Sequence, residues 1–414
     1  MRITKLTSVY GEHAIGGAER SAAGMVANLK ARGHVVDVIS LTFAGDARDP
    51  VQTSPNGALV HIPLVQFYDP YGLNGKPALP HHAVVRAAWH ALDVYNPWMA
   101  ARVQRQLETL RPDVLFTHAI QGFSVAVWAV ARKLGIKVVH MVHDHALICP
   151  GTAMTRGAVS CEKPCASCQT YSTLRETIAV MPDAIIAPSQ LVLDRHRRFG
   201  WFHQVKTQVV VGNALPANWP QAPTGKQLPG PDNPRPMVFG FIGRLDPSKG
   251  ADTLVAAAAQ FSPDQCSVRL AGGGDSNALM TSFSGKPGVV TFCGVVNAAQ
   301  FLAGIDVLVM VSRAHETFCN VVMEAACLGI PAIVSDRGAL PERVFQGESG
   351  WVIPAGDHHA LARAMAFCIA NPVEVARKGQ IGLDARLTYS QKTQTDQLED
   401  LLFQVVNDNA HPAN

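Results

Sequence analysis

The sequence is short of charge and lacks long apolar runs. Only 16% of its 414 residues are charged, and the formal net charge of +3 is too small to indicate a nucleic-acid partner. It contains no segment of about 18 apolar residues that could span a membrane. The opening MRITKLTSVY is typical of a first strand and not of a signal peptide. We therefore expect a soluble cytoplasmic enzyme.

Apolar residues, by contrast, make up 48% of the chain, enough for sizeable cores in two domains. Residues 1–215 hold 21 Lys/Arg and 14 Asp/Glu, a net of +7, and the remainder holds 14 and 18, a net of −4. The N-terminal half is thus the half suited to an anionic partner, although a random imbalance would look the same. The nine cysteines fit reduced thiols better than a disulfide framework in a chain this long.

Short apolar runs without polar alternation are separated by helical stretches along most of the chain. This order predicts α/β domains whose parallel strands are buried on both faces. It breaks at 214–236, where seven of 23 residues are proline and neither a helix nor a central strand can form. The predicted strands are Val35–Leu41, Val114–Thr117, Lys137–Val142, Ala184–Ala187 and Val209–Val211 before the break, and Met237–Ile242, Ser267–Ala271, Val289–Phe292, Asp306–Val311 and Ala332–Ser335 after it.

These patterns predict two Rossmann-like domains, residues 1–213 and 237–390, joined by a proline-rich linker at 214–236. Such a pair would place a crevice between the strand ends. The remaining residues, 391–414, carry an apolar stripe that predicts a final helix over Thr393–Val406.

The strongest candidate site is the segment SRAHETFCNVVME, from Ser312 to Glu324. A predicted strand ends before it, its loop carries Glu316, and a helix begins near Asn320. The free N–H groups of a helix start suit a diphosphate, whereas the two carboxylates suit the hydroxyl pairs of a sugar and a ribose. The alternative is that both glutamates only interact favourably with the helix dipole.

Two turns that contain glycine follow predicted strands. In GFIGRLDPSKG, Arg244 and Lys249 could neutralise a pyrophosphate, although the segment is not a Walker A loop. In GEHAIGGAER, Gly16 and Gly17 open a helix and could face a phosphate or a sugar. This segment lacks the G-x-G-x-x-G pattern of a nicotinamide site. Each turn taken alone is also compatible with an ordinary connection.

A histidine cluster ends one predicted strand in the run HMVHDHALIC. Its position places His143 at the carboxyl end of the sheet, where ligands bind in this fold class. The spacing of His140, His143 and His145 also invites a metal interpretation, which we disfavour because strand residues three apart face opposite sides.

Together these segments resemble the retaining glycosyltransferases of family 4, which have the GT-B fold of two Rossmann-like domains facing a central cleft. The motifs GGAER, GFIGRLDPSKG, RLAGGGD, TFCGVV, HETFCNVVMEAACLGIPAIVS and GWVIPAGD occur in that family's order over essentially the whole chain. The most specific is the E-x7-E pair of Glu316 and Glu324. The resemblance also implies that the helix within 391–414 crosses back onto the N-terminal domain.

The resemblance implies a role for each matching residue of the C-terminal domain. Arg244 and Lys249 would bind the donor diphosphate, Glu324 the ribose hydroxyls and Glu316 the transferred sugar. The other donor contacts would come from the backbone of Phe318, Cys319, Asn320 and Val321.

In the N-terminal domain, Gly16 and Gly17 would lie at the cleft, and His143 corresponds to the family's active-site histidine at a strand end. Asn213 matches the asparagine of an Asn-Gly turn in the family, but Ala214 replaces the glycine. This replacement puts the local role of the backbone in doubt.

The activity implied is transfer of a hexose from a nucleotide-diphosphate sugar to an acceptor hydroxyl, with retention of anomeric configuration. No D-x-D metal site stands out, so no cofactor is required for catalysis. We expect a sugar or lipid-linked glycan as acceptor, in cell-envelope or exopolysaccharide synthesis at the inner face of the cytoplasmic membrane. The rivals are a nucleotide-sugar epimerase of the same fold and an inactive sugar-nucleotide-binding subunit.

Four of the cysteines, Cys149, Cys161, Cys165 and Cys168, fall within twenty residues as C-x11-C-x3-C-x2-C. Four thiolates could hold a structural Zn²⁺ that orders this insertion, which we place in the N-terminal domain on the acceptor side. The same spacing is also compatible with free thiols, an iron–sulfur cluster or disulfides.

A basic and aromatic segment, RHRRFGWFH at residues 195–203, offers a candidate contact with an anionic membrane. The competing interpretation is a helix end whose aromatic side chains pack inward and whose arginines are merely solvated.

Overall fold

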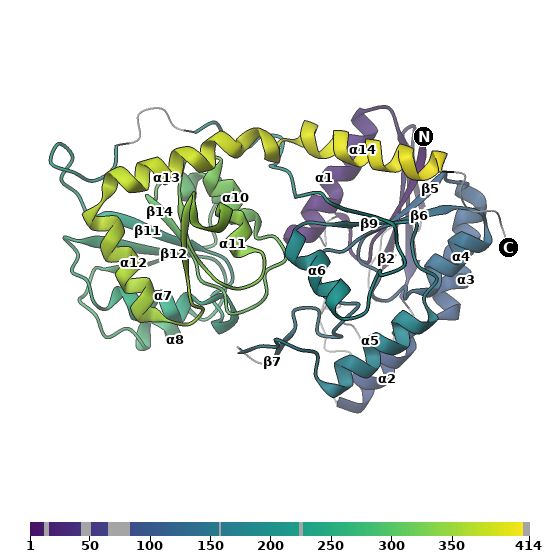
Figure 1. Ribbon diagram of the computed structural model, residues 1–414, viewed down its shortest axis with the longest axis horizontal. Helices are drawn as coiled ribbons and strands as arrows, with labels where there is room; N and C mark the ends of the chain where they lie inside the picture. Colours follow the sequence, from purple (N-terminus) through teal and green to yellow (C-terminus); the bar gives the residue numbers. More distant parts are fainter. Residues whose placement is uncertain (12–15, 43–50, 65–82, 157–158, 223–226, 409–414) are drawn as a thin grey trace. The chain divides into compact units, whose positions relative to one another are not determined.

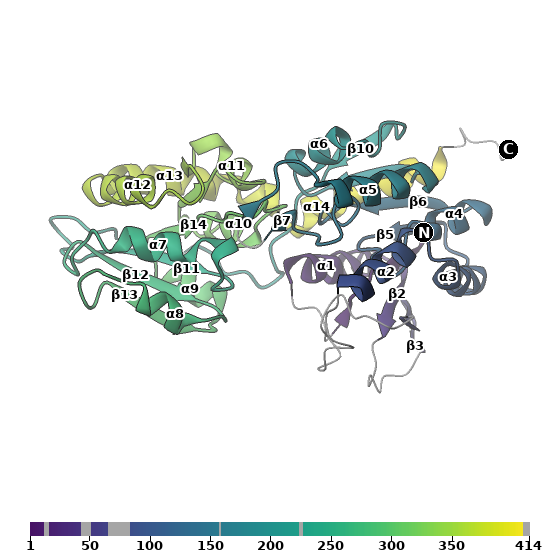
Figure 2. The same cartoon turned by 90° about the horizontal axis from the view of Figure 1, so that it is seen from below.

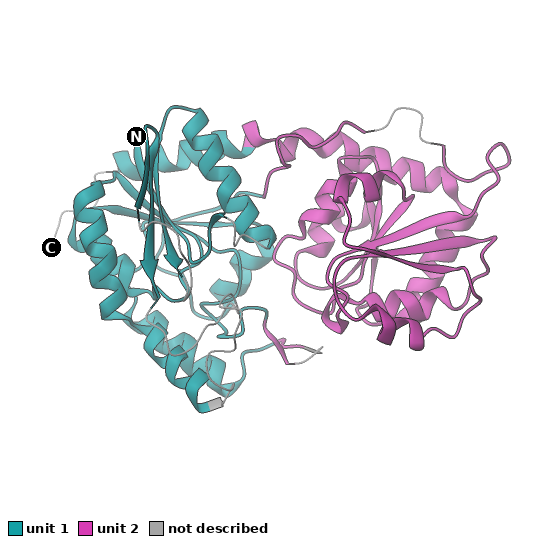
Figure 3. Cartoon of the chain, turned by 180° about the vertical axis from the view of Figure 1, so that it is seen from behind, with its two compact units in different colours: residues 1–153, 163–212, 394–414 teal, residues 154–162, 213–393 magenta. Residues whose placement is uncertain are grey.

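The computed structural model describes residues 1–11, 16–42, 51–64, 83–156, 159–222 and 227–408. The chain divides into two compact units, shown in Figure 3. Unit 1 comprises residues 1–153, 163–212 and 394–414. Unit 2 comprises residues 154–162 and 213–393.

Unit 1 is built on an eight-stranded sheet in the order β10-β9-β6-β5-β1-β2-β4-β3. All neighbouring strands are parallel except β3 and β4, which form an antiparallel hairpin at one edge. From β1 the chain moves outward in one direction to β2 and later in the other to β5, β6, β9 and β10. The bounds are β1 Arg2–Leu6, β2 Val35–Thr42, β3 Val51–Ser54, β4 Gly57–Pro63, β5 Val114–Thr117, β6 Lys137–Met141, β9 Ala184–Ala187 and β10 Thr207–Val210.

Among the helices of unit 1, α1 (Gly17–Ala31), α3 (Pro97–Leu110) and α4 (Ala126–Lys133) bury mainly apolar side chains. The start of α3 shows local control by sequence, because the Asn96 side chain accepts a hydrogen bond from the Met99 N–H and Pro97 occupies the first turn. The helices are α1 Gly17–Ala31, α2 Ala83–Val94, α3 Pro97–Leu110, α4 Ala126–Lys133, α5 Ala166–Ile178 and α6 Gln190–Arg198 (Figure 1).

Unit 2 contains a parallel six-stranded sheet in the order β13-β12-β11-β14-β15-β16, with helices on either side of its strands (Figure 2). Its core joins all six strands to α7, α10 and α12. The strands are β11 Met237–Ile242, β12 Cys266–Ala271, β13 Val290–Gly294, β14 Val307–Met310, β15 Ala332–Ser335 and β16 Gly350–Ile353. The helices are α7 Ala251–Ala258, α8 Ser276–Thr281, α9 Ala298–Ala303, α10 Asn320–Ala326, α11 Leu340–Arg343, α12 His358–Ala370 and α13 Pro372–Asp384.

The last helix, α14 (Gln391–Asn407), groups with unit 1 from Gln394 onward. Its apolar stripe lies in the same core as Ile3 and Met25, and Arg32 forms ion pairs with Asp396 and Glu399. The stripe consists of Leu398, Leu401, Leu402 and Val405.

The predicted strands all form, with ends shifted by at most two residues. Within the described part of the linker at 214–236 the structure contains no helix or extended strand, and residues 223–226 lie outside the described residues. None of the described helices combines the length and apolar composition needed to cross a bilayer.

Candidate functional site

The topology of unit 2 creates a switch point between β11 and β14. These strands are neighbours, yet the chain continues from β11 to β12 and β13 on one side and from β14 to β15 and β16 on the other. The chain therefore continues in opposite directions from the carboxyl ends of these two strands, and ligands of open α/β sheets bind at such a point. Lys249 lies in the loop that follows β11 and Glu316 in the loop that follows β14.

Lys249 and Glu316 meet at this point, with Nζ 2.6 Å from Oε1. Their side chains are only 23% and 14% exposed. Burial lowers the pKa of Lys249, but the charge of Glu316 and its hydrogen bond outweigh burial and raise the pKa overall. The ammonium therefore stays protonated and available to a second anion.

The two loops are locked together by their backbones. Gly250 has a φ of +81°, and a Cβ there would lie 2.2 Å from the carbonyl oxygen of Val311. The Ser248 carbonyl accepts hydrogen bonds from the N–H groups of Arg313 (2.8 Å) and Ala314 (3.0 Å). Lys249 is thus positioned by the chain that leads into Glu316.

A third loop, which follows β15, supports Glu316 from its other side. Gly338 has a φ of +59°, and a Cβ at this residue would lie 2.2 Å from the Glu316 carbonyl oxygen. The N–H of Ala339 donates to the same oxygen at 2.7 Å. Only glycine fits this approach, so the loop after β15 packs directly on the backbone of Glu316.

The start of α10 presents backbone and hides side chains. Cys319 precedes the helix in the left-handed region, with a φ of +67°, and burial raises the pKa of its thiol. Phe318 is 2% exposed and packs with Met323 and Tyr389, with the Arg343 guanidinium 4.2 Å from its ring centroid. The main chain of this segment, and not the Phe318 ring, is therefore what a ligand could reach.

Asn213 is tied to this helix, because its Nδ2 donates to Asn320 Oδ1 at 2.7 Å. Ala214 is not among the residues with a positive φ, so it avoids the strain that would have required glycine.

The other two predicted donor residues, Glu324 and Arg244, differ in their exposure. Glu324 is half-buried on α10. The Arg244 side chain is 77% exposed and lies 3.6 Å from Asp246, outside the Lys249–Glu316 pair.

In unit 1, His143 follows β6 and is buried with its ring stacked on His118, which follows β5. The ring centroids are 3.9 Å apart and the planes differ by 17°. Burial, and then the nearby Lys5, lower the pKa of His143 to about 3, so the imidazole is neutral near pH 7. Sequence reasoning missed His118, although the run VLFTH, a strand followed by a histidine, carried the signal.

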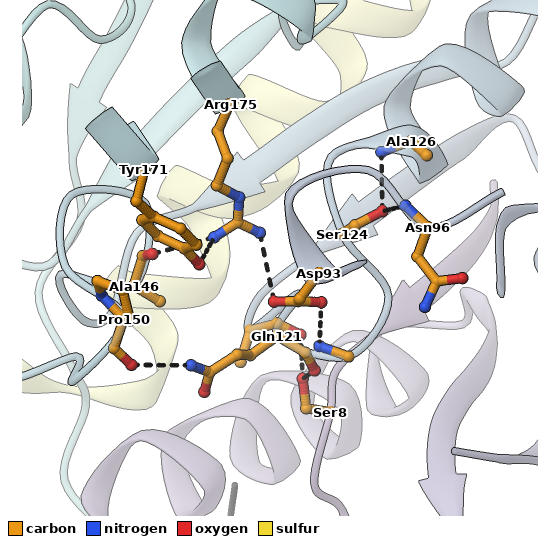
Figure 4. Close-up of polar contacts among 12 residues, drawn as sticks. Ser8, Asp93, Asn96, Gln121, Ser124, Ala126, Ala146, Pro150, Tyr171 and Arg175 are labelled. Carbon is orange, nitrogen blue, oxygen red and sulfur yellow. Dashed lines mark hydrogen bonds and ion pairs between the residues drawn. The ribbon is translucent and has the colours of Figure 1, made fainter. Parts of the chain in front are cut away.

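A buried ion pair contacts the loop that follows β6, which also carries His143 (Figure 4). Arg175 on α5, fully buried, has Nη2 3.7 Å from Asp93 Oδ2 on α2. Its Nη1 donates to the Ala146 carbonyl at 3.0 Å and to the Tyr171 hydroxyl at 2.5 Å. Asp93 in turn accepts the N–H of Gly122 at 2.7 Å.

The same network joins three loops at the carboxyl edge of the sheet (Figure 4). Gln121 Nε2 donates to the Pro150 carbonyl at 3.2 Å, and Ser8 Oγ donates to the Gln121 carbonyl at 2.7 Å. The loops after β1, β5 and β6 are therefore fixed to one another and to the Asp93–Arg175 pair. No pattern in the sequence marked these residues, since they come from separate helices and loops.

Gly17 begins α1, and Gly16 is its N-cap residue with extended backbone. Residues 12–15 of the same motif lie outside the described residues. Both glycines belong to unit 1, whereas Arg244, Lys249, Glu316 and Glu324 belong to unit 2.

The cysteine-rich insertion differs from the sequence-based expectation. Cys149 and Cys168 lie with their sulfurs 3.5 Å apart, and the Cys168 thiol also hydrogen-bonds Cys165. Cys161 lies within Met154–Glu162, which groups with unit 2 and not with the N-terminal domain, because its contacts are with that unit. Among the described residues no set of three or more His, Cys, Asp or Glu side chains is arranged to hold a metal.

Side-chain packing also decides how the histidine run and the basic, aromatic segment are interpreted. In the histidine run, the Nδ1 atom of His140 lies 2.9 Å from the Thr117 hydroxyl and is therefore engaged in a hydrogen bond. This contact argues against His140 as a metal ligand. Of the two interpretations of residues 195–203, the structure supports the helix end whose aromatic side chains pack inward, because Trp201 and Phe202 are 0% and 1% exposed. These rings pack inward and cannot enter a bilayer surface.

Two sequence-family models match the chain. The model described as "Glycosyltransferase Family 4" matches residues 15–211, and the model described as "Glycosyl transferases group 1" matches residues 236–371.

Among the relatives, a phosphatidyl-myo-inositol mannosyltransferase of Mycobacterium leprae is 30% identical over 71% of this chain and 74% of its own length. An uncharacterized 42.6 kDa protein in the cps region of Klebsiella pneumoniae is 25% identical over 83% of this chain and 87% of its own.

Two solved structures share the fold at low sequence identity. A sucrose-phosphate synthase of Thermosynechococcus elongatus superposes with a TM-score of 0.71 at 20% identity, covering 97% of this chain and 98% of that one. Anabaena HepE, solved in complex with UDP-glucose, has a TM-score of 0.67 at 18% identity, covering 98% and 100%.

Proposed function

The chain belongs to glycosyltransferase family 4 and has the GT-B fold, and on that premise we propose that it transfers a hexose from a nucleotide-diphosphate sugar to an acceptor hydroxyl with retention of configuration. The observation that carries this proposal is the enclosed pair of Lys249 and Glu316 at the switch point of unit 2. A cation for phosphate and a carboxylate for sugar hydroxyls lie within one hydrogen bond of each other there.

In this proposal each donor group has a residue of unit 2 as its partner. Lys249 and the exposed Arg244 bind the diphosphate, Glu316 binds the transferred sugar, and Glu324 binds the ribose. Backbone groups of Phe318, Cys319, Asn320 and Val321 supply further contacts, which fits the burial of the Phe318 ring.

The reaction needs charge stabilisation more than a protein base. The bond between the anomeric carbon and the diphosphate oxygen breaks, and negative charge grows on the leaving group next to Lys249. The acceptor oxygen bonds to the anomeric carbon on the same face, and its proton passes to the leaving phosphate. His143, neutral and buried, contributes a hydrogen bond to the sugar and takes up no proton. Gly16 and Gly17 at the start of α1 are also assigned to donor binding in this proposal.

We propose that catalysis requires no metal, because Lys249 and Arg244 supply the positive charge. A Zn²⁺ held by Cys149, Cys161, Cys165 and Cys168 would have a structural role only. The Cys149 and Cys168 sulfurs lie 3.5 Å apart, which brings two of the four proposed ligands together, whereas no three are arranged for a metal among the described residues. Elemental analysis of protein purified without added metal tests this. About one zinc per chain is expected, and a metal-free, fully active preparation would contradict it.

For the acceptor we propose a lipid-linked glycan in cell-envelope or exopolysaccharide synthesis, used at the cytoplasmic face of the membrane. The names of two relatives support this class of acceptor. One relative is named a phosphatidyl-myo-inositol mannosyltransferase, and the other is named as a protein in a cps region. Contact with anionic lipid would come from the net charge of +7 on residues 1–215 and not from the buried rings Trp201 and Phe202. Binding to anionic liposomes that weakens as salt increases is the expected result.

The direct test of the function begins with a panel of nucleotide sugars examined by thermal shift, because a donor that binds the folded state raises the melting temperature. A stabilising donor is then incubated with glycan acceptors, and transfer is followed by release of nucleoside diphosphate. If no donor stabilises the protein or is consumed, the proposal is wrong.

A further inference from the structure

The segment Met154–Glu162 forms a small hairpin, called here the insertion hairpin. Its strands β7 (Thr155–Arg156) and β8 (Val159–Ser160) pair antiparallel, and the N–H of Cys161 donates to the Met154 carbonyl at 2.7 Å to close its base. Residues 157–158 lie outside the described residues. The hairpin is inserted in the sequence of unit 1 but groups with unit 2 (Figure 3).

The first contact of the insertion hairpin is with the start of the Glu316 loop. The Ser160 hydroxyl donates to the Arg313 carbonyl. Arg313 is firmly held, since its guanidinium binds Asp252 at 2.8 and 2.9 Å and its N–H donates to the Ser248 carbonyl. The hairpin therefore contacts the junction of the loops that carry Lys249 and Glu316.

The second contact is made by Glu162 at the end of the hairpin. Its carboxylate accepts a hydrogen bond from Arg337 Nη1 and lies 4.0 Å from His315 Nε2. His315 directly precedes Glu316, and Arg337 directly precedes Gly338, the glycine that packs on the Glu316 backbone. Glu162 thus links the residue that precedes Glu316 to the loop that packs on the Glu316 backbone.

We propose that Glu162 is a positioning residue for the transferred sugar and that the insertion hairpin forms part of the donor site. Glu162 acts through Arg337 and His315 on the placement of the Glu316 carboxylate. The Glu162 side chain is 63% exposed, so its ion pair adds little to folding stability. Its effect is on the position of the Glu316 carboxylate. This inference rests on the proposed function of Glu316 as the residue that binds the transferred sugar.

The test is a double-mutant cycle with Glu162→Gln and Arg337→Gln in the full chain. Each variant should lower kcat/KM for the donor about three- to tenfold, and the double variant should be no worse than either single one, because both remove the same link to Glu316. Binding of UDP and of GDP, measured by calorimetry, should change by less than about twofold, since the nucleotide does not contact Glu316. Glu176→Gln, a carboxylate of α5 in unit 1, is the matched control.

Three results would overturn the inference. They are an unchanged kcat/KM for the donor in Glu162→Gln, additive effects in the double variant, or a fall in nucleotide affinity equal to the fall in kcat/KM. A melting temperature within about 3 °C of wild type shows that each variant is folded. Wild-type protein that consumes no donor would instead refute the proposed function, so the two failures are distinguishable.

Discussion

Lys249 and Glu316 form an ion pair, and in the proposed function its two charges serve different parts of the donor. With 23% of its side chain exposed, Lys249 is more enclosed than a solvated loop lysine. We expect Lys249→Ala to lower kcat/KM for the donor about 100- to 1000-fold, because an ammonium next to the leaving diphosphate acts mainly in the transition state. Unfolding should become easier by about 1–3 kcal/mol, since Glu316 loses its partner.

Steady-state kinetics at saturating acceptor and a thermal melt measure these two effects of Lys249→Ala. Lys286→Ala, an exposed lysine of unit 2, is the control and should match wild type in both. An unchanged kcat/KM for the donor would remove Lys249 from the site.

The replacement of Glu316 by glutamine and that of Glu324 by glutamine should have different effects on nucleotide binding and turnover. Glu324→Gln should weaken binding of the bare nucleoside diphosphate about tenfold, because a charged hydrogen bond to ribose is lost. Glu316→Gln should leave that binding within about twofold of wild type and lower turnover, since its partner is the sugar. Calorimetry with UDP and GDP decides between them, and equal losses in the two variants would contradict the roles assigned.

Some of these residues could be predicted from the sequence alone. Lys249 and Glu316 could be singled out because motifs at adjacent strand ends converge in a parallel sheet. Arg175 and Asp93 could not, because they lie on helices 82 positions apart and meet only through tertiary packing. Nor could a nine-residue pattern show that Trp201 points inward, since that depends on which face of the segment meets the core.

At the scale of elements, α2 and α5 are joined by a buried carboxylate with an unusual charge state. Burial raises the pKa of Asp93 to about 7, and Arg175 and the Gly122 N–H offset burial only in part. The folded state therefore holds the proton more tightly than the unfolded chain does. Between pH 4 and 7 this group lowers stability as pH rises, by at most about 1.4 kcal/mol per pH unit.

Asp93→Asn imitates the protonated carboxyl and removes this dependence. The melting temperature of the variant should therefore rise relative to wild type as the pH goes from 4 to 7. Melts of both proteins across that range supply the difference, in which the other titrating groups cancel. A variant that becomes relatively less stable as pH rises would mean that Asp93 is an ordinary ionised partner of Arg175.

Periodicity revealed the parallel strands well, because strands buried on both faces read as short apolar runs. It did not reveal the antiparallel β3–β4 edge or the two-residue strands of the insertion hairpin. Strand β3 is exposed along its whole length and carries no apolar signal. The hairpin is held by contacts with unit 2 that are more than 150 positions away in sequence.

At the scale of the whole molecule, the proposed function assigns phosphate binding and sugar binding to unit 2, whereas the loop that carries His143 belongs to unit 1. The excess of basic residues in the N-terminal half agrees with an anionic acceptor there. Family membership and fold followed from motif order, because the switch-point loops that define the site are also the most distinctive segments. Donor, acceptor and linkage did not, since these depend on loop surfaces that one sequence does not specify.

The most direct test of the central claim is the fate of a sugar-labelled nucleotide donor incubated with the protein, with and without a glycan acceptor. We predict that label moves to the acceptor with retained configuration and that an equal amount of nucleoside diphosphate is released only when acceptor is present. Label that stays on the nucleotide as an epimerised sugar would identify an isomerase. A donor that binds but is never consumed would identify a sugar-nucleotide-binding subunit, and either result would contradict the account.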